Sequence, residues 1–160
     1  RGDGLRDQRN WIEAAEAYGS ALKLYPYERT YWTQFGHMVK EQECFGLAEI
    51  AYRTAAAFGA ERGDVLPHLR FVMERQGASE SNFPIRFHEP LVLHRQVPGN
   101  PDLLTLARLL WGALDVSEAD QLCLLRTSAS LDEMVAAMIA DPRFEKSNRV
   151  WLELLDEGEL

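Results

Sequence analysis

The feature that most constrains the fold of this chain is a repeat in its first half. Similar residues recur 34 positions apart. The pairs are Gly2 and Gly36, Ala14 and Ala48, Tyr18 and Tyr52, Ala21 and Ala55, and Phe35 and Leu69. All are small or large apolar residues, the kind that fills contacts between packed elements. A period of this length predicts supersecondary units that stack on one another and bury a continuous core between neighbours.

Gly36 interrupts a run that otherwise has the spacing of a helix. Tyr31, Trp32 and Phe35 lie on one face of such a helix. Glycine is less favourable than alanine inside a helix by about 0.5–1 kcal/mol, because its backbone loses more freedom on folding. This cost predicts that a second helix approaches Gly36 closely, with Ala48 as the small residue on the facing side.

The middle of the first half resembles the tetratricopeptide repeat over about residues 29–62. The positions that match the pattern of this family are Trp32, Phe35, Gly36, Ala48, Tyr52 and Ala55. The preceding repeat lacks part of its first helix, but it keeps Gly2, Trp11, Ala14, Tyr18, Ala21 and Pro26. The resemblance implies pairs of antiparallel helices in a short solenoid, with a concave face that holds a segment of a partner protein.

A third, half-complete repeat begins at Gly63 and keeps Leu69 and Gly77. Arg70 stands where the family has a small residue, so we expect the array to stop at this helix, which acts as its cap. The predicted domain therefore covers residues 1–77 and is all-α.

Residues 78–100 are predicted to form an extended linker. Helix is excluded through most of this stretch by Pro84, Pro90, Pro98 and Gly99. Apolar residues alternate with others in a strand-like pattern at Phe83, Ile85, Phe87, Leu91 and Leu93. Two interpretations stay open. The segment either runs along the last repeat helices and covers their apolar surface, or it is a mobile connection between independent domains.

The last part of the chain, residues 101–160, is predicted to be a small four-helix domain. The expected helices span about residues 101–113, 117–126, 130–140 and 142–157. Helix starts are indicated by Asn100-Pro101, by Asp141-Pro142, by Ser117 with Asp120 and by Ser130 with Glu133. The run from Ser130 to Phe144 resembles the closing motif of a small helical domain of unknown function, found in bacterial glycosyltransferases and in some secreted bacterial proteins.

Charge and composition exclude several classes of protein. The net charge of −8, with basic residues scattered singly, argues against binding to a nucleic-acid backbone. No run of about 18 apolar residues indicates a transmembrane helix. Cys44 and Cys123 occur in apolar helical contexts without a pairing framework, so they are predicted to be small buried residues in a reducing, cytoplasmic protein. The start at Arg1 suggests a fragment of a longer protein.

Residues that would carry catalysis or bind a metal do not cluster in the sequence. Four histidines are present, but none forms a His-x-x-x-His pair, and no Cys-x-x-Cys exists. His37 and His68 fall on the inner helices of the repeats, where solvated histidine is the default interpretation and a polar contact or a ligand role is the alternative. We therefore expect no catalytic residues, no metal and no cofactor, and the fragment is not expected to be an enzyme.

Two functions from different classes remain. The first is a non-catalytic module for protein interaction, which binds a protein or peptide segment on the concave face of the array. The side chains expected to contact that partner are Thr30, Thr33, His37, Lys40 and Phe71. The second is an accessory or acceptor-positioning region of a bacterial glycosyltransferase or polysaccharide-synthesising enzyme, because arrays of similar sequence are attached to such enzymes.

The resemblance also predicts one class of ligand that this array does not bind. Chaperone-binding members of the family hold the carboxylate of an acidic C-terminal peptide with lysine, asparagine and arginine side chains. The matching positions here are Asp3, Gln34, Asp64 and His68, so the positive clamp is absent.

Overall fold

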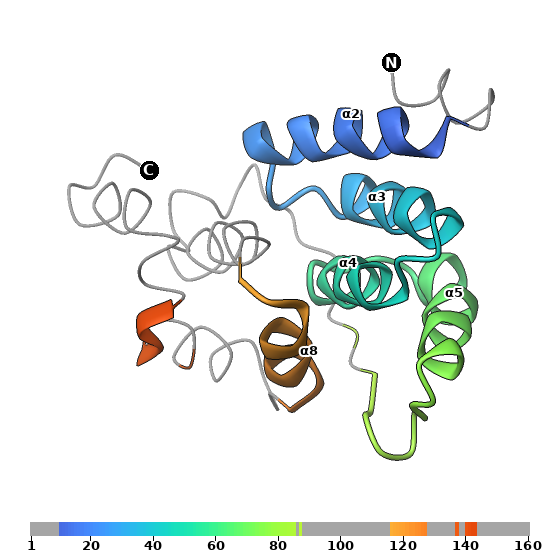
Figure 1. Cartoon of the computed structure of the whole chain (residues 1–160), viewed down its shortest axis with the longest axis vertical. Coiled ribbons are helices and arrows are strands. Elements are labelled where there is room, and N and C mark those ends of the chain that lie inside the picture. Colours follow the sequence, from blue (N-terminus) through green and yellow to red (C-terminus); the bar gives the residue numbers. More distant parts are fainter. Residues whose placement is uncertain (1–9, 86, 88–115, 128–136, 138–139, 144–160) are drawn as a thin grey trace. The chain divides into compact units, whose positions relative to one another are not determined.

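The computed structural model describes residues 10–85, 87, 116–127, 137 and 140–143, and all regular secondary structure within these residues is helical (Figure 1). The prediction of an all-α fold is confirmed for this part of the chain. The chain divides into two compact units, Arg1–Pro90 and Leu91–Leu160. The predicted helices over residues 101–113, 130–140 and 142–157 lie wholly or mostly outside the described residues.

Four helices of the first unit follow one another along the chain. They are α2 (Trp11–Leu24), α3 (Arg29–Glu41), α4 (Phe45–Ala57) and α5 (Arg62–Arg75). Each packs on the next, and α3 also contacts α5 (Figure 1). The core between them consists of the predicted repeat positions and their neighbours. Ala14, Trp32, Ala48, Tyr52, Ala55 and Leu69 all have no exposed surface.

Trp32 connects α3 to the turn that follows α2. Its ring is completely buried, and its indole Nε1–H donates a 2.7 Å hydrogen bond to the carbonyl of Pro26 in the turn between α2 and α3. Phe35 packs edge-on against this ring, with centroids 6.4 Å apart. A buried indole N–H needs an acceptor. The carbonyl of Pro26 therefore fixes the entry of α3 to the end of α2.

The close approach predicted at Gly36 exists, but the group that makes it is an aromatic ring. A Cβ atom added to Gly36 would lie 2.7 Å from Cε1, 3.0 Å from Cδ1 and 3.1 Å from Cζ of Tyr52. These are the nearest atoms, so the ring of Tyr52 makes the closest contact at this position. Ala48 is buried, and its small size allows α3 and α4 to approach until the Tyr52 ring lies over Gly36.

Three helices of the first unit end in the same kind of turn. Cys44 N–H donates to Val39 O at 2.9 Å after α3, Ala60 N–H donates to Ala55 O at 3.0 Å after α4, and Ala78 N–H donates to Met73 O at 2.9 Å after α5. These bonds are the signature of the Schellman motif, which requires a left-handed residue just before the donor. That residue is Gly59 or Gly77 in two of the turns, but it is Glu43, with φ of 61°, after α3.

Helix α5 contains Pro67 in its interior. Proline has no backbone N–H, so the carbonyl of Gly63 cannot accept the helical hydrogen bond from residue 67. The helix nevertheless continues, because Val65, Leu69 and Val72 have no exposed surface and hold it against the rest of the unit. Tertiary packing outweighs the local preference here.

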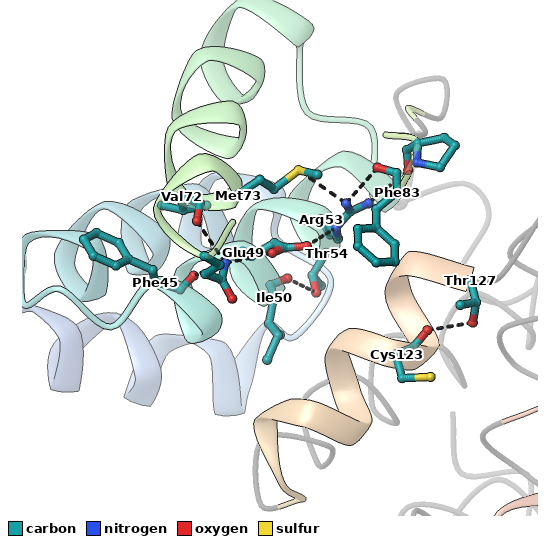
Figure 2. Close-up of polar contacts among 12 residues, drawn as sticks. Phe45, Glu49, Ile50, Arg53, Thr54, Val72, Met73, Phe83, Cys123 and Thr127 are labelled. Atoms are coloured by element: carbon teal, nitrogen blue, oxygen red, sulfur yellow. Dashed lines mark hydrogen bonds and ion pairs between the residues drawn. The ribbon is translucent and has the colours of Figure 1, made fainter. Parts of the chain in front are cut away.

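A buried ionic network lies on the side of α4 that faces the end of α5 (Figure 2). Glu49 is completely buried, and its Oε2 accepts a 2.8 Å hydrogen bond from Nε of Arg53. Gln76 Nε2 donates to Oε1 of the same carboxylate at 2.9 Å. The network therefore neutralises and hydrogen-bonds a carboxylate that would be very costly to bury alone.

The guanidinium of Arg53 also holds the segment that follows α5. Its Nη2 donates to the carbonyl of Phe83, and its Nη1 donates to the carbonyl of Pro84, both at 3.1 Å (Figure 2). The segment turns over residues 79–82 and then continues without regular secondary structure through residue 85. Its described part contacts the helices, as one of the two open interpretations expected, while residues 86 and 88–97 lie outside the described residues.

Arg70, the residue that interrupts the repeat pattern, is exposed on α5. Its Nε donates to Oε2 of Glu80 at 2.9 Å, in the turn after the helix. Phe87 lies under the guanidinium of Arg62, with Cζ 4.7 Å from the ring centroid. The segment therefore contacts α5 at its first residue, Arg62, and in its second half, at Arg70.

In the second unit, helix α8 spans Glu118–Thr127 and begins where its capping residues predict. Asp120 N–H donates to Oγ of Ser117 at 3.3 Å, and that hydroxyl donates to Oδ2 of Asp120 at 2.8 Å. Asp141 also caps as predicted, because the backbone N–H of Arg143 donates to its Oδ1 at 2.9 Å. Arg143 forms ion pairs with Asp120 and Asp141.

The prediction that both cysteines are buried is wrong. Cys44 and Cys123 are free thiols, and both are exposed. Cys44 is the N-cap of α4, in the turn that follows Glu43, so it lies outside the apolar stripe of either helix. Cys123 follows the buried pair Gln121 and Leu122 on α8 and points away from the face that these residues bury.

Candidate functional site

One face of α3 and one face of α5 lie beside each other and form the candidate site. On α3 the exposed or half-buried residues Thr30, His37 and Lys40 recur at helical spacing, and on α5 His68 and Phe71 do so. Two cavities open along this face, with volumes of about 520 and 490 Å³. His68 lines both cavities.

The first cavity is polar. Its lining includes Arg29, Thr30, Thr33, Gln34, His37, Glu61, Gly63, Asp64 and His68. Glu61 is the N-cap of α5, and Asp64 is in the first turn of that helix. Thr33 Oγ1 donates to the carbonyl of Arg29 at 2.9 Å, so its hydroxyl proton is used within α3. Two carboxylates and one guanidinium give this cavity an acidic excess.

The second cavity is aromatic and lined by charges of both signs. Its residues are Lys40, Glu41, Glu43, Phe45, Pro67, His68, Phe71 and Arg75. Phe71 has 40% of its surface exposed, and Phe45 meets its ring edge-on with centroids 6.0 Å apart. Arg75 and Lys40 lie over the Phe71 ring, at 5.0 and 5.9 Å from its centroid. An aromatic surface between two cations is therefore accessible in this cavity.

A chain of polar side chains connects the two cavities. His37 Nδ1 lies 2.7 Å from the hydroxyl of Tyr52, and Lys40 Nζ lies 3.1 Å from Nδ1 of His68. The two imidazole rings meet edge-on with centroids 4.5 Å apart, and Tyr52 stacks on His68 at 5.8 Å. An ammonium group has only donors, so Nδ1 of His68 must accept, and its proton is on Nε2.

The pKa shifts of His68 and Tyr52 agree with this assignment of the proton. Burial lowers the pKa of His68, and the charge of Lys40 lowers this pKa further. Burial raises the pKa of Tyr52, and the carboxylate of Glu41 contributes to this increase. At neutral pH His68 is therefore an uncharged acceptor and Tyr52 is a neutral hydroxyl.

The structure brings together all five side chains that the sequence suggested for partner contact. Thr30, Thr33 and His37 line the first cavity, and Lys40 and Phe71 line the second. Three of the positions compared with the chaperone clamp, Gln34, Asp64 and His68, line the first cavity together, whereas Asp3 lies outside the described residues. The role of these residues in binding stays a prediction.

Sequence reasoning missed several residues of this face. Glu61, Pro67 and Arg75 were not singled out, although they continue the spacing of His68 and Phe71 along α5. The same spacing could have found them. Of the two interpretations of His37 and His68, the structure favours a polar contact over a freely solvated side chain, since both are half-buried and each has a side-chain partner.

Neither a metal site nor a membrane-spanning helix occurs in the described part of the chain. Within those residues, no three histidine, cysteine, aspartate or glutamate side chains come together as a set of metal ligands. No described helix is both long enough and apolar enough to cross a membrane.

Comparisons of the chain with family models, with curated proteins and with solved structures gave no match. The description of this face therefore rests on its own geometry.

Proposed function

We propose that the first unit is a non-catalytic interaction module of the tetratricopeptide type, and that its α3/α5 face binds a segment of a partner protein. The observation that carries this proposal is the pair of cavities that share His68. Residues of α3 and α5 line both cavities. Ligand sites are concave surfaces with a few convergent polar groups, and this face has that form.

The arrangement of the helices supports the same proposal. In the repeat pattern, α3 and α5 are the first helices of two consecutive repeats. Equivalent helices of stacked units line the same side of an array, which is how such arrays form extended binding surfaces. Phe71 and Lys40 project from these helices, yet neither contributes to the buried core. Side chains that the fold does not need are thus concentrated on one face.

Gly63 offers a direct way to test the proposal. It lines the first cavity, and a Cβ atom added to it would meet nothing within 4 Å. We therefore expect Gly63→Trp to fill the cavity without disturbing the helix packing. The matched control is Ile12→Trp, which adds the same ring at a position on α2 that is 61% exposed.

The experiment is a selection from a displayed library of random dodecapeptides against the wild-type protein. We expect enriched peptides to bind wild type and the Ile12→Trp variant equally, and to lose most of their affinity for Gly63→Trp. Circular dichroism of both variants shows whether the fold is intact. A library that yields no enriched peptide, or peptides that bind Gly63→Trp as well as wild type, would contradict the proposed function.

A further inference from the structure

We infer that the partner segment carries a basic side chain that binds over Glu61 and Asp64, and an apolar, preferably aromatic, side chain that packs on Phe71. This inference rests on the proposed function and specifies the chemistry of the partner. It follows from the different character of the two cavities along the same face.

The first cavity favours a positive group. Glu61 and Asp64 are exposed, and among the described residues neither forms an ion pair. A guanidinium or ammonium group placed here would find two carboxylates as acceptors, and hydrogen bonds to charged groups are among the stronger ones.

Acidic residues at a helix start do not define a site by themselves, because they also stabilise the helix dipole. The adjoining cavity supplies the independent observation. There the Phe71 ring is 40% exposed, with Phe45 against its edge and Pro67 in the lining of the same cavity. His68 lines both this cavity and the acidic one. It provides an apolar contact for a side chain a short distance along the same segment.

Charge determines which cavity receives the basic side chain and which receives the apolar one. In the aromatic cavity the cations Lys40 and Arg75 lie over the Phe71 ring, and two carboxylates, Glu41 and Glu43, balance their charge. In the first cavity Glu61 and Asp64 stand against Arg29 alone, so a net negative charge favours a basic side chain there. His68, between the two cavities, accepts a hydrogen bond from Lys40 and carries no charge at neutral pH. The basic side chain is therefore directed to Glu61 and Asp64, and the apolar one to Phe71.

The test uses fluorescein-labelled synthetic nonapeptide pools. In each pool one arginine and one phenylalanine are fixed, two to four residues apart, in either order, and the other positions vary among alanine, serine and glutamine. Matched pools carry glutamate in place of arginine, or alanine in place of phenylalanine. Binding is measured by fluorescence anisotropy. We expect the best arginine–phenylalanine pool to bind about tenfold or more tightly than its glutamate counterpart.

Variants of the protein locate the two contacts. Glu61→Gln with Asp64→Asn is expected to weaken the arginine–phenylalanine pool about tenfold and to remove its preference over the glutamate pool. The control is Glu13→Gln with Glu16→Gln, which removes the same charge from exposed positions on α2 and should leave binding unchanged. Phe71→Ala should weaken every pool that contains phenylalanine, without changing the preference for arginine.

Failure of the inference can be told apart from failure of the proposed function. If the glutamate pool binds equally or better, or if no pool binds, the inference is overturned. In either case the random library decides the proposed function independently. Peptides enriched from that library, blocked by Gly63→Trp but lacking basic residues, would overturn the inference and leave the binding function standing.

Discussion

The contact between Gly36 and Tyr52 makes a quantitative prediction about stability. Alanine at position 36 would place Cβ 2.7 Å from Cε1 of a ring that has no exposed surface. Ordinary carbon contacts need about 3.5–4.0 Å. The ring must therefore move by about an ångström, and its hydroxyl is held at 2.7 Å from Nδ1 of His37. Overpacking of this kind costs about 1–3 kcal/mol.

Gly63→Ala is the matched control, since it makes the same substitution in a helix where the added Cβ meets nothing. Replacing glycine by alanine stabilises a helix by at most about 1 kcal/mol. The gain is smaller at position 63, because this residue is close to the start of α5. We expect Gly63→Ala to be neutral or stabilising and Gly36→Ala to be destabilised. The difference between their free energies of unfolding should be about 1–3 kcal/mol.

The measurement is urea denaturation followed by tryptophan fluorescence in a background with Trp111→Phe and Trp151→Phe. The signal then comes from the first unit, where Trp32 is completely buried. A second background tests the cause. Tyr52→Leu removes the three ring atoms that the new Cβ would meet, so Gly36→Ala should cost much less in that background. The reasoning is refuted if Gly36→Ala is as stable as Gly63→Ala, or if its cost is the same with leucine at position 52.

Three other perturbations have definite expected outcomes. Glu43→Gly should raise the free energy of unfolding by about 0.5–1 kcal/mol, because φ of 61° suits glycine, and a thermal or urea melt measures it. Arg53→Met should lower it by about 3–5 kcal/mol by leaving Glu49 buried without its partner, and adding Glu49→Gln should recover much of this loss. An NMR titration should give His68 a pKa below 6.5, which Lys40→Met raises toward the usual value. The unfolded chain then binds more protons than the folded one, so the contribution of His68 to stability is present above pH 6.5 and is lost as the pH falls through its folded-state pKa.

Local patterns predicted much of this fold. The period placed helices where α3, α4 and α5 occur, because small and aromatic residues at fixed spacing determine which faces can pack. Ser117 and Asp141 predicted helix starts correctly, because capping depends on a side chain and a backbone N–H only a few residues away. The side chains suggested for the binding face followed from the same spacing.

Features that depend on distant segments could not be predicted in this way. Glu49 and Arg53 have the spacing of an ordinary exposed ion pair on a helix. They are buried because the end of α5 and the segment after it pack over them. Pro67 should end a helix by local rules, but packing on both sides of it keeps α5 continuous. The cavities likewise need two helices that are separate in sequence, so one helix alone does not reveal them.

The hydrogen bonds of Arg53 have a consequence for how this sequence can change over time. The guanidinium binds the main-chain carbonyls of Phe83 and Pro84, and not their side chains. Every amino acid supplies that carbonyl. Substitutions at positions 83 and 84 can therefore accumulate while the attachment persists, whereas residue 53 must keep a planar donor with several N–H groups. Related chains should preserve arginine at this position even where the segment that it holds has diverged.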